Sequence, residues 1–309
     1  MKILVTGGAG FIGSHVVDRL LGDGHAVAIV DNLSTGRRQL VNGAAELIVC
    51  DLRSDQLQDT VDTVKPDAVV HVAAQAAVSR SVADPAFDAS VNVVGTIKLL
   101  EGCRRLGIGR IVYTSTGGAA YGDTDVVPTP EDHPARPSSP YGVSKVTAER
   151  YLECFQGLTG IKPLALRLAN IYGPRQNPLG EAGVIAIFCH RLLRGEPCIV
   201  NGDGEQTRDY VFVEDVAAAV SRAIARPDIT GMVNIGTGVE TTVNELYRRL
   251  ARAAGVTTPA PHAPARPGEQ RRSVLAAARA KELLGWTPSV PLADGLERTF
   301  AYFKKEVGA

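Results

Sequence analysis

The first half of the chain alternates short apolar runs with longer segments of helical spacing. Six apolar runs have the length and composition of buried strands, and they span 3–6, 26–30, 47–50, 68–72, 110–114 and 164–168. Segments with helical periodicity begin near Phe11, Asp55, Pro85 and Ser139. This alternation predicts an α/β fold, a Rossmann-type doubly wound parallel sheet with helices on both faces and ligands at the carboxyl ends of its strands.

The alternation loosens after Asn170. Turn-rich stretches interrupt the apolar runs at 173–175 and 201–204. The most proline-dense stretch, 259–267, predicts a loop that crosses the ligand cleft, and a last helix is expected from Ala293 to about Lys305.

Composition and charge exclude several classes of protein. Hydrophobic residues make up 45% and charged residues 21%, and 33 basic side chains balance 33 acidic ones. This balance argues against a general nucleic-acid binder, and no apolar run has the length of a membrane helix. The five cysteines are scattered, with no spacing typical of a metal site, so we expect reduced thiols, a cytoplasmic location and no metal.

A glycine-rich turn follows the first predicted strand directly, with the sequence Gly7-Gly8-Ala9-Gly10-Phe11-Ile12-Gly13. Glycines at this spacing permit a tight turn, a close approach of backbone to a pyrophosphate, and close packing of the next helix. The amino end of that helix offers free N–H groups to phosphates. The turn therefore predicts a dinucleotide site.

Carboxylates follow the second and third predicted strands. Asp31 is placed to accept both ribose hydroxyls of NAD, and its charge would repel the extra phosphate of NADP. Asp51 is placed either to meet the adenine amino group or to cap the following loop. NAD is therefore the expected cofactor.

Candidate catalytic side chains lie in the middle of the chain. Tyr141 and Lys145 are four residues apart in a predicted helix, so both side chains can point to one side. A nearby ammonium favours the phenolate form of a tyrosine, which is otherwise a poor base at neutral pH. The fifth strand ends at hydroxyl-bearing residues, of which Thr116 or Ser115 can hydrogen-bond the reacting oxygen, although such residues also cap turns.

Together these features resemble the extended short-chain dehydrogenase/reductases, and within them the UDP-glucose (UDP-galactose) 4-epimerases. The resemblance covers nearly the whole chain and rests on eight segments in the correct order: VTGGAGFIGSHV at 5–16, DNLSTG at 31–36, HVAAQAAV at 71–78, Tyr141 with Lys145, LRLANIYGPRQ at 166–176, GDGEQTRDYVFVEDVA at 202–217, NIGTG at 234–238 and RPGE at 266–269.

The resemblance implies a role for each matching residue. Tyr141 is the base, Lys145 supports it and the nicotinamide ribose, and Asn92 braces the site. Many relatives carry their catalytic hydroxyl four residues before the Tyr-Gly pair, which here is a glycine, whereas counting from the strand end selects Thr116, with Ser115 as the alternative. The implied NAD contacts are Gly7, Gly10, Phe11, Ile12, Gly13, Asp31, Asn32, Ser34, Thr35, Gly36, Asp51, Leu52, Ala73, Ala74, Gln75, Asn92, Tyr141 and Lys145.

For the substrate, the resemblance implies contacts from both halves of the chain. Asn170 would contact the diphosphate, Arg208 and Arg266 would grip the phosphates, and Glu269 would meet the uridine ribose. Ser273 would face the 2-substituent of the sugar, where a small side chain leaves room for an N-acetyl group. Thr116 would touch the sugar itself.

The resemblance also implies an activity and an organisation. It favours a UDP-sugar 4-epimerase that acts on UDP-glucose and UDP-galactose by transient oxidation at C4 with bound NAD, with the N-acetylhexosamine forms as further candidate substrates. A nucleotide-sugar 4,6-dehydratase or another extended short-chain enzyme is the alternative, although Gly117-Gly118 stand where dehydratases carry Asp-Glu. A regulator that only senses NAD is a third alternative. We expect an NAD-binding domain over 1–169, a mainly nucleotide-sugar-binding domain over 170–309 with segments returning to the first, and a homodimer.

Overall fold

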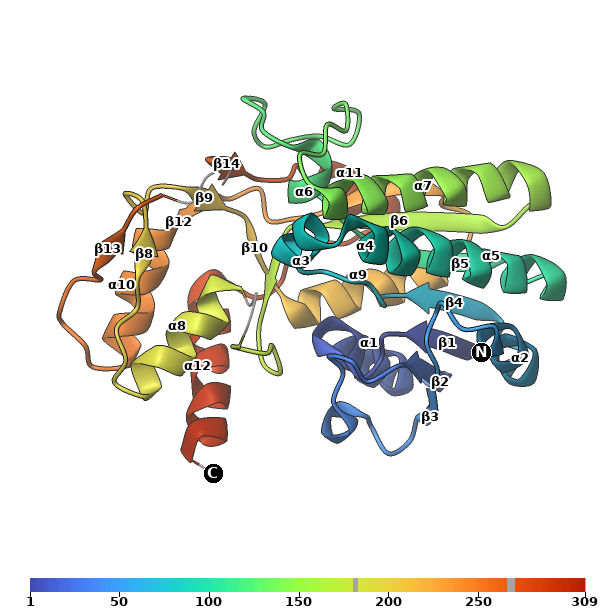
Figure 1. Cartoon of the computed structure of the whole chain (residues 1–309), viewed down its shortest axis with the longest axis horizontal. Helices are drawn as coiled ribbons and strands as arrows, with labels where there is room; N and C mark the ends of the chain where they lie inside the picture. Colours follow the sequence, from blue (N-terminus) through green and yellow to red (C-terminus); the bar gives the residue numbers. More distant parts are fainter. Residues whose placement is uncertain (180–182, 266–269, 309) are drawn as a thin grey trace.

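The computed structural model describes residues 1–179, 183–265 and 270–308. A parallel sheet of seven strands forms the centre of the fold (Figure 1). Its strands lie in the order β11-β6-β5-β4-β1-β2-β3. Their bounds are β1 (Lys2–Thr6), β2 (Ala26–Asp31), β3 (Glu46–Val49), β4 (Ala68–His71), β5 (Arg110–Thr116), β6 (Lys162–Leu168) and β11 (Gly231–Ile235). The predicted α/β fold is confirmed, and each predicted apolar run forms a strand.

Helices cover both faces of this sheet. One face packs against α1 (Phe11–Gly22), α9 (Val213–Ala225) and α11 (Ala278–Leu284), and the other against α2 (Gln56–Val64), α5 (Gly95–Leu106) and α7 (Pro140–Thr159). Successive residues of β1 point to opposite faces. Val5 packs in the core under α1, α9 and α11, called the first core here, and Leu4 packs in the second core, under α2, α5 and α7. Strands buried on both faces read as continuous apolar runs, which is why the sequence revealed them.

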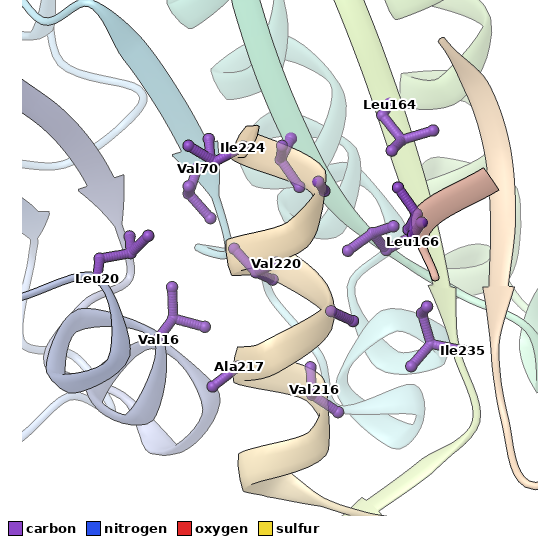
Figure 2. Close-up of a cluster of buried hydrophobic side chains, with 14 of the residues drawn as sticks. Val16, Leu20, Val70, Leu164, Leu166, Val216, Ala217, Val220, Ile224 and Ile235 are labelled. Atoms are coloured by element: carbon purple, nitrogen blue, oxygen red, sulfur yellow. The ribbon is translucent and has the colours of Figure 1, made fainter. Parts of the chain in front are cut away.

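The helix α9 carries much of the first core. Figure 2 shows Val216, Val220 and Ile224 of this helix lying between side chains of α1 and side chains of the sheet. Both α9 and β11 come from the second half of the chain, yet they pack on and extend the central sheet. The sequence did not indicate β11, because its run contains a glycine and an asparagine.

The carboxyl ends of β1 and β4 lie side by side at the point where the strand order reverses. The N–H of Ala73, just after β4, donates to the carbonyl of Thr6 at 3.1 Å. Chain connections leave this point in opposite directions, which opens the edge of such a sheet to a ligand. Further helices follow β4, namely α3 (Val78–Ala83), α4 (Pro85–Ala89) and a π-helical turn at Ser90–Val94, and a 3₁₀ turn lies at Arg38–Leu40.

The rest of the second half forms a smaller unit around its own apolar core. Its helices are α8 (Val184–Leu193), α10 (Val243–Ala253) and α12 (Leu292–Gly308), which includes the predicted last helix. Short strands of this half pair with one another, in small separate sheets: β7 (Asn170–Tyr172) with β10 (Tyr210–Phe212), β9 (Thr207–Arg208) with β12 (Thr241–Thr242) and β14 (Arg272–Ser273), and β8 (Val200–Asn201) with β13 (His262–Ala263). The stretch 259–267 was expected to be a loop throughout, but β13 within it pairs with β8. Among the described residues, no helix is long and apolar enough to cross a membrane.

Candidate active site

The turn between β1 and α1 has the geometry that the glycine pattern predicts. Gly7 adopts a φ of +72°, and a β-carbon on Gly13 would lie only 2.0 Å from the carbonyl oxygen of Gly7. Gly10 caps α1 without any side-chain hydrogen bond, and the first turn, which includes Phe11 and Ile12, holds no acidic residue. The amino end of α1 is therefore open to an anion, as the pyrophosphate of a dinucleotide requires.

The loop after β2 lies against this turn. The carboxylate of Asp31 is buried and accepts hydrogen bonds from the N–H groups of Ala9 at 3.0 Å and Leu33 at 2.8 Å. Gly36 lies beside it, since a β-carbon there would come within 2.7 Å of an Asp31 oxygen. The remaining residues predicted in this loop, Ser34 and Thr35, are exposed. A negative charge therefore stands at the end of β2, next to the glycine-rich turn.

The carboxylate after β3 is held in place by its neighbours. Asp51 accepts from the guanidinium of Arg53 at 2.9 Å and from the amide of Asn32 at 2.8 Å. The Arg53 partner keeps the pKa of Asp51 well below its usual range. Leu52 is buried against Gly95 at the start of α5. Asp51 thus ends β3 as a fixed charge joined to the loop after β2.

The segment after β4 is fixed by a buried amide. The side chain of Asn92 accepts from the backbone N–H of Gln75 at 2.8 Å and donates to the backbone carbonyl of Gln75 at 2.9 Å. It also donates to Ser144 at 3.0 Å, inside α7. Ala73 and Ala74 precede this anchor and are partly exposed at the sheet edge. Asn92 therefore joins the predicted cofactor loop to the helix that carries Tyr141 and Lys145.

The two candidate catalytic residues of α7 lie over the carboxyl end of β5. Ser139 caps this helix by accepting from the N–H of Gly142 at 3.2 Å. The Lys145 ammonium donates to the carbonyl of Thr114 at 2.7 Å and lies 4.2 Å from the centre of the Tyr113 ring. Burial lowers the pKa of Lys145 to about 7 and raises the pKa of Tyr141 to about 12. Both groups are thus displaced toward their neutral forms.

Two adjacent hydroxyls at the end of β5 have different partners. Thr116 hydrogen-bonds the Tyr141 phenol, which opposes the effect of burial and lowers the pKa of that phenol. Ser115 is buried and donates to the carboxylate of Glu149 at 2.5 Å. Glu149 forms a buried ion pair with Arg167 of β6 at 2.6 Å. Thr116 therefore contacts the tyrosine, whereas Ser115 helps to hold α7 in place through Glu149.

A cavity of about 540 Å³ lies beyond β7, between α8 and the short strands. Asn170 and Arg208, both predicted substrate contacts, line it. Its other lining residues were not indicated by the sequence, because each reads there as an ordinary helix, strand or loop position: Gly183, Val184, Ile187, Phe188, Arg191, Ile199, Asn201, Gln206, Tyr210, Val243 and Ala263. The cavity offers apolar and aromatic walls with two arginines, which suits a base joined to phosphates.

Ser273 links this cavity region to the end of β5. It pairs with Arg208 through β14 and β9, and its hydroxyl would come within 2.8 Å of a β-carbon on Gly118. A β-carbon on Gly117 would lie 2.4 Å from Leu275. The strand β14 thus packs directly on the backbone after Thr116. The predicted phosphate ligand Arg266 and the predicted ribose ligand Glu269 lie outside the described residues.

The site has three parts: the glycine-rich turn after β1, the Tyr141–Thr116 pair beside Lys145, and the cavity lined by Arg191 and Arg208. Acid–base chemistry at an alcohol or carbonyl is the chemistry such a pair supports. Within the ranges that the structure describes, no group of three or more His, Cys, Asp or Glu side chains is placed to hold a metal ion.

Comparison with known proteins gives full-length matches. The chain matches the NAD dependent epimerase/dehydratase family over residues 3–236. It is 46% identical over 311 residues to a UDP-glucose 4-epimerase of Mycolicibacterium smegmatis, covering 99% of each chain. A UDP-glucose 4-epimerase of Thermotoga maritima, solved with UDP-glucose, matches with a TM-score of 0.96 and 46% identity, over 99% of this chain and 100% of that one. The UDP-glucose 4-epimerase of Thermus thermophilus, in complex with NAD, matches with a TM-score of 0.92 and 43% identity, over 98% of this chain and 99% of that one.

Proposed function

Because the chain belongs to the NAD dependent epimerase/dehydratase family, we propose that it is a UDP-sugar 4-epimerase, an isomerase that interconverts UDP-glucose and UDP-galactose with bound NAD. The observation that carries the proposal is the contact of Thr116 with Tyr141 at the end of β5, beside Lys145, in the same sheet whose strand β1 leads into the glycine-rich turn. NAD binds at residues 1–169, and the nucleotide sugar binds mainly at residues 170–309.

Tyr141 is the acid–base group in this mechanism. It removes the proton from the 4-hydroxyl of the sugar and returns a proton to the 4-keto oxygen after the sugar has turned over in the site. Thr116 hydrogen-bonds the phenol and lowers its pKa, so it favours the basic form. NAD, held by the residues after β1, β2 and β4, would supply reversible hydride transfer at C4, and the positive charge of its oxidised nicotinamide ring would add to that of Lys145 near the phenol.

The nucleotide part of the substrate belongs in the cavity beyond β7. Its volume of about 540 Å³ is within the range of small-molecule sites. Arg208 and Arg191 supply permanent positive charge for the diphosphate, and Asn170 supplies an amide at the side nearest the sheet. Arg266 and Glu269 are assigned to a phosphate and to the uridine ribose, as the resemblance implies.

The packing after Thr116 argues against a dehydratase. Dehydration needs an added acid–base pair to remove the C5 proton and release the C6 hydroxyl. The positions for that pair are Gly117 and Gly118, which have no side chain to supply an acid or a base, and a β-carbon at either would come within 2.8 Å of Leu275 or Ser273. A regulator without turnover would not need the Tyr141–Thr116 contact beside Lys145.

The experiment that tests the proposal is a product assay. Purified protein is mixed with UDP-galactose, and the UDP-glucose formed is quantified by chromatography. Conversion in both directions to one equilibrium ratio is expected, with no net consumption of NAD. Formation of a 4-keto-6-deoxy sugar would identify a dehydratase, and NAD binding without any product would identify a sensor.

The range of sugars is proposed to include UDP-N-acetylglucosamine. The side chain of Ser273 lies against Gly118, close to the catalytic threonine, and its small volume leaves space for a 2-acetamido group. Ser273→Tyr should abolish conversion of the N-acetyl sugar and spare that of the plain hexose, measured as kcat/KM for both. A wild-type protein that does not convert UDP-N-acetylglucosamine would refute this part of the proposal.

We further propose a cytoplasmic homodimer that packs through α7 and the π-helical turn at Ser90–Val94, which leads into α5. An apolar groove of about 690 Å³ lies on this side, lined by Pro85, Ala89, Val93, Pro140 and further residues of α4, the π-helical turn, the segment before α7 and α7 itself. Val94 and Val143 border it with 46% and 50% of their surface exposed. Apolar side chains gathered on neighbouring helices are typical of a self-complementary interface.

Light scattering coupled to size-exclusion chromatography tests the dimer. Val143→Glu should produce monomers, because two buried carboxylates would face each other across the two-fold axis. Val239→Glu is the matched control, since Val239 is 61% exposed in the loop before β12. A wild-type monomer, or a dimer that survives Val143→Glu, would contradict the proposed interface.

A further inference from the structure

A buried carboxylate that the proposed mechanism does not use lies close to the catalytic pair. Asp88, on α4, is 1% exposed. One of its oxygens accepts from the side-chain amides of Gln75 at 2.8 Å and Asn92 at 3.2 Å. The other oxygen is buried without a hydrogen-bond partner, and in the described ranges no lysine or arginine forms an ion pair with it. Burying a carboxylate without an ion-pair partner costs free energy, so its presence here points to a role for the charge.

The hydrogen bonds of Asp88 lead to the catalytic helix. Asn92 donates to Ser144 on α7, and Ser144 donates to the backbone carbonyl of Tyr141 at 3.0 Å. Gln75 lies in the cofactor loop after β4, and its amide also donates to the carbonyl of Ala77 at 2.9 Å. Asp88 is therefore the shared acceptor of two amides that connect the cofactor loop with the base.

The charge of Asp88 acts on both members of the catalytic pair. It raises the pKa of Lys145, so it favours the ammonium, and it raises the pKa of Tyr141. Glu149 also raises the pKa of Lys145, but its carboxylate is bonded to Arg167 and Ser115. The other titratable groups facing the lysine are neutral: burial raises the pKa of Tyr113, from β5, and lowers the pKa of His71, from β4, to about 3.

We propose that Asp88 is a positioning residue of the epimerase reaction, which holds the cofactor loop against α7 and supplies the unpaired negative charge that faces Lys145. The inference rests on the proposed function for its catalytic readout only. Its physical basis is that Glu149 is neutralised by a guanidinium, whereas Asp88 is compensated only by amide dipoles and therefore keeps its field at the lysine.

Asp88→Asn separates the charge from the hydrogen bonds. The amide oxygen of the variant can still accept from Gln75 and Asn92, so the network remains while the charge is lost. Base catalysis needs Tyr141 deprotonated and Lys145 protonated, and Asp88 raises both pKa values. Both limbs of the kcat–pH profile should therefore move to lower pH, by on the order of one unit. A carboxylate with a structural role alone would lower kcat without moving the two limbs together.

A second readout does not depend on turnover. The phenolate absorbance that wild type shows and Tyr141→Phe lacks is titrated against pH, with and without Asp88→Asn. Its midpoint should fall by a similar amount. Asp84→Asn is the matched control, because Asp84 is exposed at the amino end of the same helix and an asparagine retains its cap. The control should leave both the profile and the titration unchanged.

Several results would overturn the inference. Unmoved limbs and an unmoved phenolate midpoint in a folded Asp88→Asn protein would show that the charge has no role. If that variant does not fold, Asp88→Ser removes the same charge with a smaller side chain, and failure of both to fold would make Asp88 purely structural. A wild-type protein that binds NAD but converts no UDP-sugar would refute the proposed function, while the phenolate titration would still decide the role of Asp88.

Discussion

The proposed cofactor site and the cavity beyond β7 differ in how the chain supplies their residues. The cofactor residues come from loops that each follow a strand of one sheet, so consecutive motifs in the sequence become neighbours in space. The cavity residues come from α8, from short strands and from single loop positions. One site is built by repetition of a strand–loop–helix unit, whereas the other is assembled from segments whose pairing only the fold reveals. Local sequence signals therefore identify the first much better than the second.

The largest expected effect lies at the junction of the two regions. Tyr141→Phe should reduce kcat by roughly 10²- to 10⁴-fold, because the phenol is the proposed proton acceptor. NAD affinity should remain, since the glycine-rich turn and Asp31 are untouched. Steady-state kinetics and calorimetric titration with NAD measure both. Activity near that of wild type in a folded variant would remove Tyr141 from the mechanism.

A second prediction compares the two hydroxyls at the end of β5. Thr116→Val should lower kcat roughly 10- to 100-fold and move the acidic limb of the profile to higher pH, because Thr116 lowers the pKa of Tyr141. Ser115→Ala should retain activity and cost roughly 1.5–3 kcal/mol of unfolding free energy, since it removes one buried hydrogen bond to the Glu149 carboxylate. The pair is measured by pH-dependent kinetics and by chemical denaturation. The reverse pattern would make Ser115 the catalytic hydroxyl.

The third prediction tests the cavity itself. Arg191→Gln should raise KM for the UDP-sugar about tenfold with kcat preserved, because the loss of a charged hydrogen bond to the diphosphate acts on binding. Arg194→Gln is the matched control on the same part of the chain, since Arg194 is exposed and pairs with Glu196 instead. Equal effects of the two substitutions would mean that general surface charge, and not the cavity wall, attracts the substrate.

The same contrast decides which parts of the fold and of the site could be predicted from the sequence. The strands β1, β2, β4, β5 and β6 could be predicted because both of their faces are buried, whereas β7 to β10 are too short to leave a periodic pattern. The carboxylates after β2 and β3 could be placed because strand ends meet at one edge. Counting from the strand end favoured Thr116 but left Ser115 as an alternative, since the difference between them depends on Glu149 and Arg167, which approach from other elements. The same holds for Ile187 and Arg191, which the sequence shows only as positions on a helix.

The smallest expected effect concerns the choice between NAD and NADP. It tests Asp31, in the cofactor site that the sequence motifs predict best. Asp31→Asn keeps an oxygen that can accept from the N–H groups of Ala9 or Leu33, so the loop should hold its shape. The amide no longer repels a 2′-phosphate and accepts more weakly from the ribose. NAD affinity should therefore fall by up to about tenfold while NADP affinity rises, as titration calorimetry with both cofactors would show.

The matched control for this last change is Asp67→Asn. Asp67 is exposed just before β4, at the opposite end of the parallel strands, where it accepts from the backbone N–H of Lys2 at 2.7 Å. Removing its charge should leave the ratio of NAD to NADP affinity unchanged, because dissolved salt screens an exposed charge at the far end of the strands from the cofactor. If the ratio changes equally in both variants, net charge sets the preference. If it changes in neither, selectivity comes from another part of the loop after β2, and the motif-based assignment of Asp31 is wrong even though its position at the sheet edge is right.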